Sequence, residues 1–112
     1  MATANFFQRG EALDYTNGTG SAIDAGTVIV LGTKAKIGIA GCDIPAGETG
    51  SVHVEGVFEF PEKSGESAIA MGDPVYWDGS AITATSTSNT PAGYAAAPAA
   101  ASATKILVKI NA

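Results

Sequence analysis

The 112-residue sequence contains only one cysteine, one histidine and one tryptophan. A single cysteine excludes an internal disulfide and a cysteine-rich zinc site. Six basic residues against 11 acidic ones give a net charge of −5, which argues against a nucleic-acid-binding protein because such a protein needs a basic patch. No apolar run approaches the ~20 residues of a membrane-spanning helix, and residues 1–10 lack the pattern of a signal peptide. We therefore expect no nucleic-acid partner and no membrane association.

Leucine is also rare, whereas small and β-branched residues are abundant. Three leucines stand against nine isoleucines and seven valines, and the chain holds 21 alanines and 14 glycines. β-Branched side chains lose little freedom on a pleated surface, so this composition favours strands over helices. The length suits one domain. We predict an N-terminal arm at residues 1–10 followed by a single β domain at residues 11–112.

Turn signals such as Asn17-Gly18 and Asp78-Gly79 separate short runs with strand character. The runs cover residues 12–16, 27–31, 36–40, 51–60, 74–77, 82–85, 92–96 and 105–110. Many short strands separated by glycine-rich turns are typical of a small β-sandwich or barrel. We therefore predict an all-β fold with at most one short helical turn, near residues 62–70. The alanine-rich residues 95–103 are predicted to end a strand and continue as a loose loop.

Two of these strands allow more detailed predictions. Residues 51–60 alternate in character, so the face that includes Val52 and Phe60 should meet the core while the face that includes His53 points to water. Residues 27–31 form a continuous apolar run, which predicts a strand buried on both faces.

Three segments place an isoleucine three residues before a glycine, and they begin at Ile23, Ile44 and Ile69. Each is interpreted as a turn in which the isoleucine enters the core and the glycine adopts a conformation that a Cβ atom would oppose. The spacing between the segments is unequal, so we do not interpret them as a solenoid repeat.

The residues that could carry chemistry have simpler structural interpretations. His53 shares a strand face with Glu55 and Glu59, which would suit a metal or acid–base site, but a solvent-exposed face is the interpretation we favour. Cys42 has no base other than His53 to activate it, so it is predicted to be a small buried residue.

Two further sites for chemistry are weighed and set aside. Asp73 and Asp78 would supply paired carboxylates, yet both stand where turns bound one short strand. The sequence has no phosphate-binding loop and no Gly-x-Ser-x-Gly motif. We therefore predict no catalytic residues, no cofactor and no metal, and so no enzyme.

Six short segments stand in a distinctive order along nearly the whole chain. They are Leu13-Asp-Tyr-Thr-Asn17, Ile23-Asp-Ala-Gly-Thr-Val-Ile-Val-Leu-Gly32, Asp43-Ile-Pro-Ala-Gly-Glu-Thr-Gly50, Val54-Glu-Gly-Val-Phe-Glu-Phe-Pro61, Gly72-Asp-Pro-Val-Tyr-Trp-Asp78 and Ala92-Gly-Tyr-Ala95. Each alone is a weak turn and strand signature. In this order and spacing, the set resembles the capsid cement, or decoration, proteins of tailed phages.

The resemblance implies a β-rich structural protein without catalytic residues. It implies a place on the outer surface of a double-stranded DNA phage head, after synthesis in the cytoplasm of the bacterial host. The implied partner is the major capsid protein, bound at joints between its subunits so that the shell is stabilised. A homotrimer is the implied oligomer, with a dimer or a monomer left open.

The N-terminal arm is the predicted contact segment, because it carries the aromatic pair Phe6 and Phe7 together with Arg9. Such a segment could add to a sheet edge on the capsid or on a neighbouring subunit. The equally open alternative is that one of the two phenylalanines packs into the core of its own chain. Trp77 is a further contact candidate, since large aromatic side chains supply much of the energy of interfaces. The alternative function is a non-catalytic β-rich adhesin or carbohydrate-binding module on a virion surface, with Trp77 at its site.

Overall fold

The computed structural model describes residues 2–65 and 67–112. Over these residues the chain forms nine strands in two antiparallel sheets and contains no helix. This confirms the predicted all-β fold, and the two sheets fit a small β-sandwich. The expected helical turn near residues 62–70 is wrong for the described residues, because Lys63 and Ile69 each form an isolated β-bridge there.

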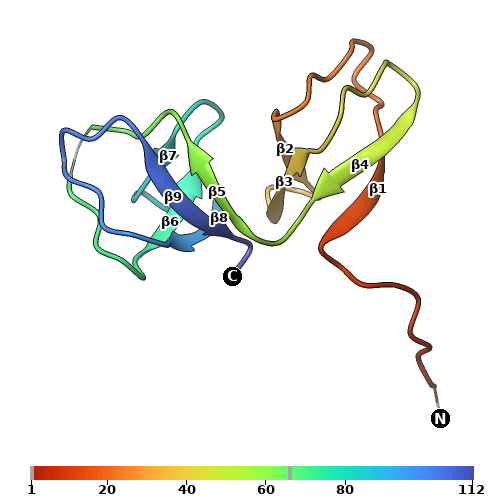
Figure 1. Ribbon diagram of the computed structural model, residues 1–112, viewed down its shortest axis with the longest axis horizontal. Helices are drawn as coiled ribbons and strands as arrows, with labels where there is room; N and C mark the ends of the chain where they lie inside the picture. The colour runs from red at the N-terminus through yellow and green to blue at the C-terminus, as the bar shows by residue number, and fades with distance from the viewer. Residues whose placement is uncertain (1, 66) are drawn as a thin grey trace.

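The first sheet has the strand order β1-β4-β3-β2 and the second has the order β5-β9-β8-β6-β7. The first sheet contains β1 (Ala12–Thr16), β2 (Val28–Leu31), β3 (Lys36–Ala40) and β4 (Thr49–His53). The second contains β5 (Val57–Phe60), β6 (Pro74–Trp77), β7 (Ile82–Thr83), β8 (Thr90–Ala95) and β9 (Ile106–Ile110). The two sheets form two halves that lie side by side, and the N-terminal arm extends away from the first (Figure 1).

The two halves follow the same plan. Without β7, the second sheet repeats the order of the first, so that β5, β9, β8 and β6 occupy the places of β1, β4, β3 and β2. In the first half Ile23 and Ile44 exchange both backbone hydrogen bonds, at 3.0 and 2.8 Å. In the second half Ile69 and Ala99 make the same exchange, both at 2.8 Å. The chain is therefore an internal duplication of one four-stranded unit.

A second set of hydrogen bonds supports this duplication. The N–H of Gly26 donates to the carbonyl of Ala40, and the N–H of Gly72 donates to the carbonyl of Ala95, both at 2.8 Å. The turns at Ile23 and Ile44 therefore belong to the first half, and the turn at Ile69 belongs to the second. In the second half Ala99 takes the place that corresponds to Ile44. This division explains why the spacing of the three turns in the sequence is unequal.

The junction between the halves lies in residues 51–60, which were predicted to form one strand. Instead β4 ends at His53 in the first sheet, and β5 begins at Val57 in the second. Gly56, between the two strands, has a φ of 123° that side-chain-bearing residues rarely adopt. The predicted alternation is confirmed on both sides of this break, since Val52 and Phe60 are buried.

The two halves share their packing at the junction. One hydrophobic cluster joins Ile37 and Ile39 of β3 to buried residues of the second half such as Val75 and Val108. A smaller cluster, which includes Ile29 and Val52, stays within the first half. Burial of such aliphatic side chains stabilises each by roughly 1.5–3 kcal/mol, so the shared cluster also holds the halves together.

Two predictions about exposure need correction. β2 is an outer strand of its sheet, and Val30 is 40% exposed, so the run at residues 27–31 is not buried on both faces. An apolar run also suits an edge strand when it packs on one face only. The alanine-rich residues 95–103 are not a loose loop throughout, because Ala99 is buried and bonded to Ile69.

A buried polar residue stabilises the loops of the first half. Asn17 is fully buried, and its Nδ2 donates to the carbonyls of Ser21 at 2.7 Å and Ile44 at 2.8 Å. In the corresponding place of the second half, the Nζ of Lys63 donates to the carbonyls of Ser64 and Ser67, at 2.9 and 3.0 Å. Each half therefore uses one side-chain donor to connect the carbonyls of its loops.

The substitution Asn17→Ala tests this role. It removes the two hydrogen bonds that Nδ2 donates to Ser21 and Ile44 and the two that Oδ1 accepts from Thr19, and each such bond contributes about 0.5–1.5 kcal/mol. We expect urea unfolding to show a loss of at least ~2 kcal/mol. The control Asn89→Ala removes an exposed hydrogen bond to the carbonyl of Thr85 and should change stability by less than about 0.5 kcal/mol. Equal effects of the two substitutions would contradict the assignment.

Candidate functional site

The residues considered for chemistry do not form a reactive site. His53 ends β4, and Glu59 belongs to β5 in the other sheet. Glu55 lies in the linker between these strands, residues 54–56. The ring of His53 packs against Phe58, with 5.8 Å between the ring centroids, and is half-buried. Across the described part of the chain, no three His, Cys, Asp or Glu side chains come together in a way that could hold a metal ion.

The aspartates that flank β6 stabilise turns, as the sequence predicts. The Oδ1 of Asp78 accepts hydrogen bonds from the N–H groups of Ser80 and Ala81, both at 2.8 Å. These bonds favour the ionised form and lower the pKa of the Asp78 carboxyl below its ordinary value. The Oδ2 of Asp73 accepts from the N–H of Ala70 at 3.0 Å. Each carboxylate thus accepts hydrogen bonds from backbone N–H groups of its own turn.

Cys42 differs from its prediction. It is exposed rather than buried, and it lies in the turn that follows β3. Among the described residues there is also no helix long and apolar enough to cross a membrane.

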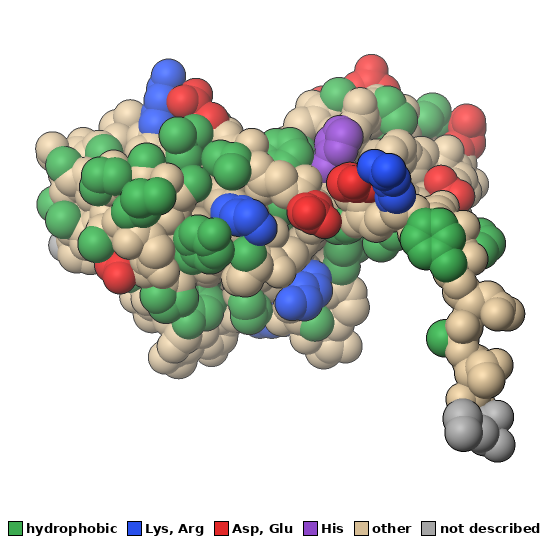
Figure 2. Space-filling view, turned by 60° about the horizontal axis from the view of Figure 1, so that its bottom comes forward, with side chains coloured by type: hydrophobic (Ala, Val, Ile, Leu, Met, Phe, Trp, Pro, Cys, Tyr) green, Lys and Arg blue, Asp and Glu red, His purple; other side chains and the backbone are tan. Residues whose placement is uncertain are grey.

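The N-terminal arm is the most exposed aromatic segment of the chain. Phe6 and Phe7 are 86% and 90% exposed, so neither packs into the core of its own chain. The arm's residues 2–10 contain no strand, and the N–H of Val54 donates to the carbonyl of Glu11 at the arm's base. In the space-filling view the arm stands clear of the body (Figure 2). The structure therefore leaves both phenylalanines and Arg9 on an open segment.

Trp77 lies in a different environment from the arm. It ends β6, is half-buried, and packs on the shared core with its ring centroid 6.1 Å from that of Phe60. The neighbouring Tyr76 is half-buried as well, because the register between β6 and β8 shifts after Val75. Much of the Trp77 side chain thus serves the protein's own packing, and the structure does not bring Trp77 together with the arm.

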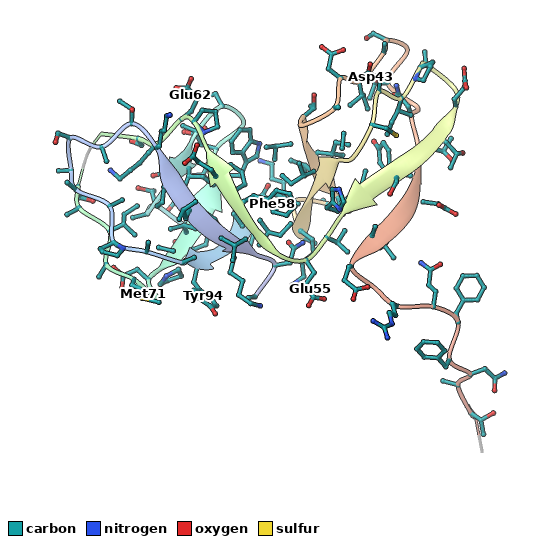
Figure 3. The ribbon with its side chains drawn as sticks, viewed as in Figure 1. Asp43, Glu55, Phe58, Glu62, Met71 and Tyr94 are labelled. Atoms are coloured by element: carbon teal, nitrogen blue, oxygen red, sulfur yellow. The ribbon has the colours of Figure 1, made fainter. Side chains whose placement is uncertain are left out.

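An apolar groove that the sequence does not reveal lies between the two halves. Its lining comes from β2 and β3 on one side and from β5 on the other: Gly26, Val28, Ile39, Phe58, Glu59, Phe60 and Pro61. Its volume is about 170 Å³. Phe58 points into the space between the halves (Figure 3). Both β2 and β5 are outer strands of their sheets, and the inner strand β3 contributes Ile39 to the lining. We call it the inter-sheet groove.

The comparison with known proteins gives a family. Residues 7–110 match the family model described as phage cement protein. The chain belongs to the phage cement protein family. A search of the curated proteins and a search of the solved structures gave no match. The match covers both halves of the duplication, so the repeated unit is part of the family's domain.

One side chain connects the two halves through hydrogen bonds. It belongs to Asn111, directly after β9. Its Nδ2 donates to the carbonyls of Ile37 at 2.8 Å and Val54 at 2.9 Å, and its Oδ1 accepts from the N–H of Ile37 at 3.1 Å. One amide side chain therefore joins the end of the second sheet to β3 and to the linker.

Sequence reasoning missed Asn111 and the inter-sheet groove for the same reason. Both depend on contacts between residues far apart in the chain, and neither has a local motif. The only signal for the groove is Gly56, which marks the break between the sheets.

The substitution Asn111→Ala tests the junction. It removes three hydrogen bonds and places alanine at a φ of 59°, a left-handed conformation that asparagine tolerates better than alanine does. We expect a loss of about 2–4 kcal/mol in urea unfolding. Amide hydrogen exchange at Ile37 should rise at least ~10-fold, because each 1.4 kcal/mol of local stability is a factor of ten. Asn5→Ala, on the exposed arm, is the matched control. Unchanged exchange at Ile37 would contradict the role of Asn111.

Proposed function

We propose that this cement protein binds the outer surface of a double-stranded DNA phage head at joints between major capsid protein subunits and stabilises the shell. The observation that carries the proposal is the family match over residues 7–110. The described residues add support, because the conspicuous exposed groups on them are apolar and suited to adhesion. An acidic chain is also suited to the outside of a shell, where it has no need to contact packaged DNA.

The N-terminal arm is proposed as the segment that makes this contact, either with the capsid or with a neighbouring copy. Phe6 and Phe7 leave two aromatic rings in water, and burial of each ring in a partner would be favourable by about 1.5–3 kcal/mol. Arg9 adds a charged group that can pair with a carboxylate. Trp77 is proposed as a secondary contact through the part of its side chain that the core leaves open.

The role is proposed to be structural and non-enzymatic, with a homotrimer as the bound form. A lattice of identical binding sites makes a weak single contact sufficient, because linked contacts raise the effective concentration of the others. A trimer of arms would engage several capsid subunits at once, which is how a small protein could hold a joint closed under internal pressure.

Capsid binding and stabilisation are tested by co-sedimentation with purified heads, followed by heating. We expect the protein to pellet with heads at a fixed ratio to the major capsid protein. Decorated heads should release their DNA at a higher temperature than undecorated ones, because contacts made only by the closed shell stabilise it. Binding without a change in the release temperature would contradict the stabilising role, and failure to bind would contradict the proposal itself.

Removal of residues 2–9 tests the arm. The deletion should leave the unfolding midpoint within the error of the intact chain, since Phe6 and Phe7 contact no core. Affinity for heads, measured by sedimentation at increasing concentration, should fall at least ~10-fold, as expected when a buried ring is lost. The double substitution Phe6→Ala with Phe7→Ala should reproduce the loss. Its control, Asn5→Ala with Gln8→Ala, changes polar arm residues and should bind normally. Normal binding by the deletion would exclude the arm as the contact.

A further inference from the structure

We propose that the N-terminal arm of one copy docks as an added strand in the inter-sheet groove of a neighbouring copy, with Phe7 in the groove and Arg9 beside Glu59. The inference rests on the proposed function only in taking the arm as a contact segment, and it chooses between the two partners left open there. Four observations on the chain carry it.

The first is the match in size and polarity. The groove has a volume of about 170 Å³, and its lining is apolar apart from Glu59. An engineered apolar protein cavity of about 150 Å³ is known to bind benzene, so this groove is large enough for one phenyl ring. Phe58 and Phe60 line the groove and would contact the incoming ring. Offset or edge-to-face contacts between aromatic rings are favourable beyond the burial of their area.

The second is the backbone at the groove. β2 and β5 are both outer strands, and Val57 of β5 is 55% exposed. An outer strand presents backbone N–H and C=O groups that another extended chain can pair with. Addition of such a strand supplies main-chain hydrogen bonds, while alternate side chains fill pockets. In an extended arm Phe7 and Arg9 lie on the same side, so both can face the groove together.

The third is charge. Each copy carries a net charge of −5, so the bodies of two copies repel one another. Residues 2–10 contain Arg9 and no acidic residue, which makes the arm the basic segment of an acidic chain. Glu59 lines the groove, and Glu62 follows just beyond Pro61. The arm is therefore the part of one copy that the groove of another attracts.

The fourth is the course of the arm. Its base is fixed by the bond from the N–H of Val54 to the carbonyl of Glu11. From there the arm leads away from the body, and its two rings are 86% and 90% exposed (Figures 1 and 3). The groove of the same chain stays open beside it. In a pair of copies, the arm of one can occupy the groove of the other, and repetition of this contact would link neighbouring copies.

The test is photo-crosslinking of the full chain in the absence of capsids. Phe7 is replaced by p-benzoylphenylalanine, which keeps an aromatic ring at the position. Equal amounts of unlabelled and ¹⁵N-labelled protein are mixed at about 1 mM, a concentration comparable to that of tethered neighbours. We expect crosslinks of mixed isotope composition from position 7 to residues 26–39 or 57–61. The same photoreactive residue at position 3 should give at most a tenth of that yield, because Thr3 lies outside the docked segment.

Competition and charge exchange make the test specific. A peptide of residues 2–10 should suppress the crosslink, and the Phe7→Ala peptide should need at least ~10-fold more, as for a lost buried ring. Arg9→Glu and Glu59→Lys should each lower the yield, and the two together should restore it. Crosslinks exclusively of unmixed composition, crosslinks only outside the groove, or no crosslinks would each overturn the proposal.

The outcome separates this inference from the proposed function. A chain that crosslinks through the groove but does not sediment with phage heads keeps the inference and contradicts capsid binding. If the Glu59→Lys variant sediments normally with phage heads and the photoreactive chain never crosslinks through the groove, the inference is overturned and capsid binding is left intact.

Discussion

The amide of Asn111 joins the two halves of the chain. Within the described residues, it connects β3 and residue 54 to the end of β9 through three hydrogen bonds of 2.8–3.1 Å. A planar amide with two donors and one acceptor fixes direction as well as distance, which a packed methyl group does not. The inter-sheet groove lies between the two halves that these bonds join. The shared cluster around Ile37 then packs behind it.

Much of the fold could be predicted from local sequence, because each strand carries its own signal. Residues 12–16, 36–40 and 74–77 are strands in the structure with the predicted bounds. The alternation in β9 also holds, with Ile106, Val108 and Ile110 buried. The misses share a cause. The break at Gly56 and the edge position of β2 depend on which sheet a strand joins, and pairing between distant residues leaves no periodic pattern in the chain.

The site was harder to predict than the fold for a physical reason. An exposed segment such as residues 2–9 could be identified from its aromatic pair, and the structure does leave Phe6 and Phe7 in water. A groove has no such signal, because its lining residues, among them Val28 and Phe58, look like ordinary strand residues in sequence. Cys42 illustrates the opposite error. Its small apolar side chain suggested burial, but its turn position leaves it exposed.

The duplication separates backbone features that both halves keep from side chains in which the halves differ. Equivalent turns keep the same backbone bonds, from Gly26 to Ala40 and from Gly72 to Ala95. Yet the exposed tip beside the first glycine is Asp24-Ala25, whereas the tip beside the second is Ala70-Met71, with Met71 68% exposed. Figure 3 places Met71 and Asp43 at opposite ends of the molecule, one on each half. The two tips also differ in the carboxylate that caps them, because the Oδ1 of Asp43 accepts from the N–H of Ala25, whereas the Oδ2 of Asp73 accepts from the N–H of Ala70. The same backbone plan therefore carries an acidic tip on one half and an apolar tip on the other, because the turn fixes the backbone and leaves the exposed side chains free to vary.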